Sequence, residues 1–229
     1  MKPFQEDLIE AYTRPPSAVA HCTIWLHGLG VSASDMDGII RNMRRSRELG
    51  LHYVAPNAPV RPITVNGGRA SRAWFDVKGD PADVPEDREG IDDSTQRMFA
   101  LLDAERGRGV PSESTVIGGF SQGASLALHA GLRYPHRLAG VVMLSGELVL
   151  ADSLAQERHE ANAQLPILML HGTQDETIPM DDALRARDRL REAGHTVDWH
   201  EFPIGHAVSP EEIEVVDVWV ERVLSAPRA

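Results

Sequence analysis

Apolar residues along the chain follow two patterns that alternate, one typical of strands and one typical of helices. Segments with the continuous or alternating apolar character of strands occur at residues 22–26, 52–56, 114–119, 138–146, 165–172 and 195–203. Segments with apolar residues at helical spacing occur between and after them, at 34–49, 91–106, 122–134, 181–194 and 210–224. Strands that alternate with helices are typical of an α/β fold, so we predict a mostly parallel central sheet flanked by helices on both faces. We expect residues 1–229 to form a single domain.

Residues 57–90 interrupt this alternation. The segment is rich in glycine, proline and aspartate and contains the tripeptide Trp74-Phe75-Asp76. Irregular segments of this length in compact domains are often functional. We therefore expect this segment to lie near a site, and we predict no separate cap domain.

Composition and charge argue against several function classes. Apolar residues make up 42% of the 229 residues, and the formal net charge of −11 argues against nucleic-acid binding, which needs a basic face. Cys22 is the single cysteine, which excludes an intrachain disulfide and a cysteine-cluster zinc site, so we expect no metal and no cofactor. The chain starts without an apolar signal region, and no apolar run approaches the roughly 20 residues of a membrane span. We therefore expect a cytoplasmic protein.

The segment from Gly119 to Gly123, GFSQG, fits the pattern G-x-S-x-G. The pattern alone is weak, but here a predicted strand ends just before the serine and a predicted helix begins just after it. A reversal this sharp forces the central residue into a strained backbone conformation and raises its hydroxyl at the carboxyl edge of the sheet. Ser121 is therefore a candidate nucleophile. The alternative is a plain strand-turn-helix with a surface serine.

A serine nucleophile needs a base within hydrogen-bond reach and a third group that orients the base. Sites in open α/β sheets lie at the carboxyl ends of the strands, so an acid and a histidine are expected just after later strands. Asp175 follows the predicted strand at 165–172, and His206 follows the one at 195–203. We favour Asp175 over three acidic neighbours, Glu176, Asp181 and Asp182.

The loop after the first predicted strand, residues 27–30, has the sequence HGLG and is the expected source of an oxyanion donor. We predict that the backbone N–H groups of Leu29 and Gln122 form the oxyanion hole. Gln122→Ala should then be mild, because only the backbone is used. Residues 28–33 also fit the dinucleotide fingerprint G-x-G-x-x-A, but no acidic residue ends the next strand to hold a ribose. A nucleotide-binding oxidoreductase is the weaker alternative.

Six motifs give the sequence a family resemblance. They are LHGLG at 26–30, PNAPVRPITVNGG at 56–68, AWFD at 73–76, GGFSQGA at 118–124, HGTQDETIP at 171–179 and GHAV at 205–208. In this order, and over nearly the whole chain, they resemble the α/β-hydrolase carboxylesterases of the phospholipase/carboxylesterase (acyl-protein thioesterase-like) family. The resemblance implies the α/β-hydrolase fold and a Ser-Asp-His triad, which falls on Ser121, Asp175 and His206.

The resemblance also implies a metal-free serine hydrolase that cleaves short- to medium-chain acyl esters. Acyl-protein thioesterase or lysophospholipase activity is the alternative, and a hydrolase fold that binds without catalysis is a weaker one. Its partner would be a small-molecule acyl ester or thioester, and a homodimer is expected because relatives often pair through a surface patch. Val31 and Glu176 depart from the family pattern, which leaves the choice of substrate open. Trp74 and Phe75 are candidates for the wall of the acyl pocket, with core packing as the alternative.

Overall fold

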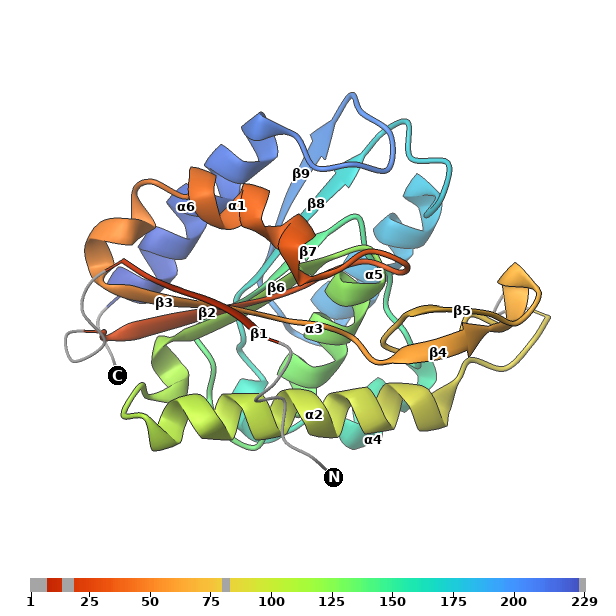
Figure 1. The fold of residues 1–229 in the computed structure, drawn as a ribbon, viewed down its shortest axis with the longest axis horizontal. Helices are drawn as coiled ribbons and strands as arrows, with labels where there is room; N and C mark the ends of the chain where they lie inside the picture. The colour runs from red at the N-terminus through yellow and green to blue at the C-terminus, as the bar shows by residue number, and fades with distance from the viewer. Residues whose placement is uncertain (1–7, 14–18, 80–82, 227–229) are drawn as a thin grey trace.

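The computed structural model describes residues 8–13, 19–79 and 83–226 of the chain. At its centre is a sheet of seven strands: β1 (Leu8–Tyr12), β2 (His21–Leu26), β3 (Leu51–Pro56), β6 (Thr115–Phe120), β7 (Gly140–Leu144), β8 (Ile167–Gly172) and β9 (Val197–Phe202). Their order in the sheet is β1-β3-β2-β6-β7-β8-β9 (Figure 1). β1 pairs antiparallel with β3, and all the other neighbours are parallel. The predicted α/β sheet is confirmed.

Helices cover both faces of this sheet: α1 (Asp37–Asn42), α2 (Arg88–Gly107), α3 (Gln122–Arg133), α4 (Leu154–Glu157), α5 (Met180–Glu192) and α6 (Pro210–Ser225). α1 and α6 lie on one face, and α2 and α3 lie on the other (Figure 1). Two hydrophobic clusters fill the layers, one containing Trp25 and Trp219 and the other Trp74 and Leu126. Because both faces are buried, the central strands are apolar at nearly every position. Among the described residues, no helix has the length and apolarity to cross a membrane.

The apolar pattern missed three strands. β1 lies at the edge of the sheet, while β4 (Val60–Ile63) and β5 (Arg69–Arg72) form a separate antiparallel hairpin within the excursion 57–90. Figure 1 shows this hairpin projecting to one side of the main sheet. Edge and hairpin strands keep part of their surface in water, so they lack the long apolar run that marks a buried strand.

The single helix predicted at 34–49 is wrong. The structure has the short helix α1 flanked by 3₁₀ turns at 33–36 and 46–49. After α1 the buried Met43 turns to an extended conformation, with ψ at 93°. The carboxylate of Asp217, on α6, then accepts hydrogen bonds from Arg45 N at 2.7 Å and Ser46 N at 2.9 Å. A contact from a distant helix therefore replaces the local helical bonds that the spacing predicts.

The parallel register brings four loops to one edge of the sheet. β2, β6, β8 and β9 run in the same direction, so the segments after their last residues leave the sheet at its carboxyl edge. Those four segments contain the loop 27–30, Ser121, Asp175 and His206. The fold thus places the predicted site residues on a common edge.

We predict that Asp217→Ala lowers the free energy of unfolding by about 3 kcal/mol, because the backbone and hydroxyl donors of buried Ser46 lose their acceptor. Asp37→Ala removes an exposed carboxylate that pairs with Arg41 at 2.9 Å, and it should change that free energy by less than about 0.5 kcal/mol. Urea unfolding of both variants measures the two values. Equal losses would contradict the role assigned to Asp217.

Candidate active site

Ser121 occupies a sharp turn between β6 and α3. Its backbone has φ at 55° and ψ at −126°, a left-handed conformation that is strained for a residue with a side chain. A Cβ at Gly119 would overlap the backbone of Gly123, and a Cβ at Gly123 would overlap the carbonyl oxygens of Leu26 and His27. The two glycines are therefore required by close backbone packing, as the G-x-S-x-G pattern predicts.

Three predicted side chains form one line of hydrogen bonds. His206 Nε2 lies 2.9 Å from Ser121 Oγ, and His206 Nδ1 lies 2.7 Å from Asp175 Oδ2. Because a carboxylate only accepts, the Nδ1 of His206 carries the proton and donates to Asp175. Nε2 is then left to accept from the serine hydroxyl, which is the arrangement a general base needs.

Asp175 is buried and held as an anion. Its other carboxylate oxygen accepts from Thr177 N and Ile178 N, each at 2.9 Å. Burial alone would raise the pKa of Asp175, but the hydrogen bonds from His206 and from these two backbone groups outweigh it and lower the pKa below its usual value. His171 supports the same turn, since its Nε2 donates to Ile178 O at 2.9 Å.

The loops that carry Asp175 and His206 are joined by backbone hydrogen bonds. Thr173 N donates to Phe202 O at 2.7 Å, and Gln174 N donates to Ile204 O at 2.9 Å. The competing acids fit less well, because Glu176 and Asp181 are exposed and Asp182 pairs with an arginine on its own helix. The structure therefore brings together the three side chains that the sequence favoured.

The loop 27–30 passes directly beside the nucleophile. A Cβ built on Gly28 would lie 3.3 Å from Ser121 Cβ, and Gly30 N donates to Arg72 O at 2.8 Å. Leu29 lies between these two anchored glycines, and Gln122 is the first residue of α3. The two predicted oxyanion donors thus flank Ser121 from separate segments, and their role stays a prediction.

The two aromatic residues predicted to wall an acyl pocket differ in exposure. Trp74 is completely buried, so its side chain has no surface to offer a substrate, whereas Phe75 is 7% exposed. Phe75 borders a small cavity that Val149 also lines, and its contact with an acyl chain stays a prediction. The side chain of Gln122 forms hydrogen bonds with the backbone of both aromatic residues, a contact that the sequence did not predict.

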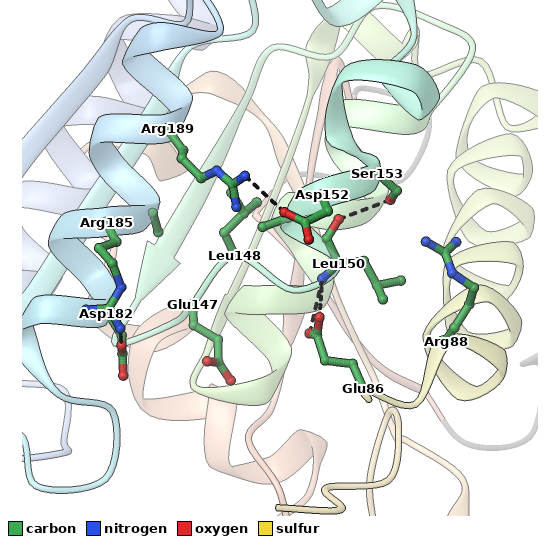
Figure 2. A pocket seen from close by; sticks show the side chains of 12 residues that line it. Glu86, Arg88, Glu147, Leu148, Leu150, Asp152, Ser153, Asp182, Arg185 and Arg189 are labelled. Atoms are coloured by element: carbon green, nitrogen blue, oxygen red, sulfur yellow. Dashed lines mark hydrogen bonds and ion pairs between the residues drawn. The ribbon is translucent and has the colours of Figure 1, made fainter. Parts of the chain in front are cut away.

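A larger pocket of about 640 Å³ opens between the segment after β7 and α5 (Figure 2). Its lining is charged, but the charges already have partners. The Glu86 carboxylate accepts from Leu150 N at 2.9 and 3.1 Å, and Arg189 pairs with Asp152 at 3.0 Å. None of the three triad candidates lines this pocket. It therefore lies outside the arrangement around Ser121.

A second group of polar side chains lies at the opposite edge of the sheet, near the amino ends of β2 and β3. Cys22, His52 and Glu105 are buried and place one potential metal ligand each within 4.8 Å of one another. The Glu105 carboxylate accepts from His52 Nδ1 at 2.8 Å and from Arg108 at 3.0 Å. Burial raises the pKa of the Cys22 thiol well above its usual value, which keeps the thiol protonated. Both oxygens of the Glu105 carboxylate therefore already have hydrogen-bond donors from this chain.

Comparisons with known proteins identify the family of this chain. A family model described as Phospholipase/Carboxylesterase matches residues 9–224. The chain is 34% identical over 220 residues to acyl-protein thioesterase 1 of Gibberella zeae, which covers 91% of this chain and 94% of that protein. It is 33% identical over 204 residues to carboxylesterase SOBER1 of Arabidopsis thaliana, which covers 88% and 90% of the two chains.

Solved structures give the same result for the fold. The crystal structure of Arabidopsis thaliana SOBER1 superposes with a TM-score of 0.84 at 32% identity, covering 90% of this chain and 99% of that one. Zea mays acyl-protein thioesterase 2 superposes with a TM-score of 0.83 at 29% identity, covering 95% and 99%. The sheet is thus that of an α/β-hydrolase, and this chain belongs to the phospholipase/carboxylesterase family.

Proposed function

We propose that this protein is a serine hydrolase that cleaves short- to medium-chain carboxylic acyl esters through an acyl-enzyme intermediate. The observation that carries the proposal is the unbroken line of hydrogen bonds from Asp175 through His206 to Ser121, at 2.7 and 2.9 Å. A line of this kind, with a buried anion at one end and a strained serine at the other, is the arrangement used to activate a hydroxyl. Family membership supports the same reaction class.

In the acylation half, His206 Nε2 takes the proton of Ser121 as its oxygen attacks the substrate carbonyl carbon. The imidazole becomes positively charged, and the adjacent Asp175 anion stabilises that charge and holds the ring orientation. Collapse of the tetrahedral intermediate breaks the bond to the leaving group, which takes the proton from His206. The product alcohol leaves and the acyl group stays on Ser121.

Negative charge on the carbonyl oxygen needs fixed donors. The N–H groups of Leu29, next to Gly28, and of Gln122, the first residue of α3, would supply them, and the amino end of α3 would add partial positive charge. Deacylation repeats the sequence with water as the nucleophile and His206 as its base. Every step uses groups of this chain.

An acyl-protein thioesterase activity is the second candidate. A thioester carbonyl is attacked by the same serine, and the leaving thiolate takes the same proton, so the arrangement around Ser121 serves both reactions. The relatives include both acyl-protein thioesterases and carboxylesterases, so family membership favours the two activities equally. A binding module without catalysis is the weakest candidate, because the line of hydrogen bonds is complete.

We predict that Ser121→Ala abolishes ester hydrolysis and labelling by a fluorophosphonate probe, which reacts only with an activated serine. Ser125→Ala is the matched control, since it removes a buried hydroxyl one turn further along α3 that accepts from Glu147 N at 3.0 Å and donates to Ser121 O at 3.4 Å. It should keep most of the activity. Ester hydrolysis and probe labelling by Ser121→Ala at wild-type levels would contradict the proposal.

We predict that Asp175→Asn lowers kcat about 10⁴-fold, because an amide no longer fixes the tautomer of His206. The folded-state pKa of Asp175 is lowered, so the ionised carboxylate stabilises the fold at neutral pH. This stabilisation is lost as the pH falls through the lowered pKa. The difference in free energy of unfolding between wild type and Asp175→Asn should therefore shrink on acidification, and a difference independent of pH would contradict the assignment.

Substrate class is tested with matched acyl esters and thioesters of graded chain length. We predict turnover of both classes, with kcat/KM falling once the acyl chain exceeds medium length. A protein that hydrolyses thioesters alone would exclude the carboxylesterase assignment and leave the mechanism intact.

A further inference from the structure

We propose that the side chain of Gln122 is a positioning residue for the oxyanion hole, acting through Trp74 on the loop 27–30. The inference rests on the proposed function and adds a role that G-x-S-x-G does not contain, since that pattern leaves this position open. It also reverses the expectation that only the backbone of Gln122 matters.

Both ends of the Gln122 amide are used. The residue is 7% exposed, its Oε1 accepts from Trp74 N at 2.8 Å, and its Nε2 donates to Phe75 O at 2.9 Å. The two partners are backbone groups of fixed polarity, so only one orientation of the amide satisfies them. Ser94 Oγ donates to Trp74 O from the other side. The segment 74–75 is therefore clamped between α3 and α2.

Further hydrogen bonds connect Trp74 to the loop 27–30. The indole N–H of Trp74 donates to His27 O at 2.8 Å. Ala58 N donates to Nε2 of His27 at 3.0 Å, so the other ring nitrogen carries the proton and donates to Gly28 O at 2.7 Å. Gly28 in turn packs against Ser121. Two buried side chains thus connect the start of α3 to the loop beside the nucleophile.

This connection matters because the two oxyanion donors belong to different segments. The N–H of Gln122 is fixed by α3, whereas that of Leu29 depends on where the loop 27–30 sits. A displacement of the loop weakens the stabilisation of the transition state more than the binding of the neutral ester. The side chain of Gln122 therefore sets the distance between its own N–H and the partner donor.

The test compares wild type with Gln122→Met, which keeps the shape of the side chain and removes both hydrogen bonds. We expect kcat to fall about 10- to 100-fold, somewhat less than the hundred- to thousand-fold loss of a whole donor, with KM within about twofold. Inhibition by an alkyl trifluoromethyl ketone, whose serine adduct carries an oxyanion, should weaken by the same factor as kcat. Wild-type kcat in a folded Gln122→Met, or a loss of kcat without weaker inhibition, would overturn the inference.

Trp74→Phe removes the next link and supplies the second variant if Gln122→Met does not fold. It should lower kcat and weaken inhibition in the same proportion. The double variant should lose no more than the larger single effect, because both changes break one connection. Additive losses would contradict a path through Trp74.

Asn162→Leu is the matched control for a loss of buried amide bonds. Asn162 is 1% exposed, accepts from Leu138 N at 3.0 Å and donates to Tyr134 O at 2.8 Å, beyond the other end of α3. The melting temperature of Asn162→Leu should fall, while its kcat and its inhibition stay near wild type. Equal kinetic losses in Asn162→Leu and Gln122→Met would show that the effect of Gln122→Met is merely structural. Ester hydrolysis by the wild type, measured in the same experiment, tests the proposed function separately. If the wild type does not hydrolyse esters, the proposed function is wrong. If the wild type does so and Gln122→Met is equally active, only this inference is wrong.

Discussion

The contact between His206 Nε2 and Ser121 Oγ, at 2.9 Å, is the one on which the rest of the site depends. It joins groups 85 residues apart, carried by strands that are not neighbours, since β7 and β8 lie between β6 and β9. Parallel pairing fixes where each strand ends along the strand direction. Backbone hydrogen bonds between the loops after β8 and β9 then fix where Asp175 and His206 lie relative to each other. The reaction geometry is therefore a consequence of sheet register more than of any single loop.

Much of this could be predicted from the sequence, for identifiable reasons. Buried parallel strands are apolar throughout, so their ends mark the carboxyl edge, and an acid or histidine just past such an end stands out. Asp175 and His206 were found in this way, whereas Ser121 was found from the G-x-S-x-G pattern at a strand-to-helix turn. The glycines around Ser121 were equally visible, because a missing side chain at fixed spacing reports a close approach of the backbone.

What could not be predicted depends on contacts between distant segments. The helix at 34–49 is interrupted because Asp217 takes its backbone donors, and the spacing of apolar residues contains no record of that partner. The side chain of Gln122 was missed for the same reason, since its two bonds reach the segment 74–75, forty-eight and forty-seven positions away. The sequence left pocket wall and core packing open for Trp74, because its complete burial within the hydrophobic cluster depends on the assembled fold. The local sequence pattern identifies helices, strands and reactive side chains at strand ends. The hydrogen bonds that support those side chains follow only from the assembled fold.

Backbone strain in this molecule is concentrated at the carboxyl edge. Among the described residues, the three with positive φ that are not glycine are Ser121, Ser145 and Leu150, and all three follow β6 or β7. Each is held by a hydrogen bond from its own N–H: to Leu144 O at 2.9 Å, to Leu170 O at 3.0 Å and to the Glu86 carboxylate. Such conformations persist only where surrounding contacts determine them. The opposite edge has the buried hydrogen bonds of Glu105 with His52 and Arg108 instead. Backbone hydrogen bonds from the sheet and its loops thus offset the strain at the edge where the hydroxyl of Ser121 is presented.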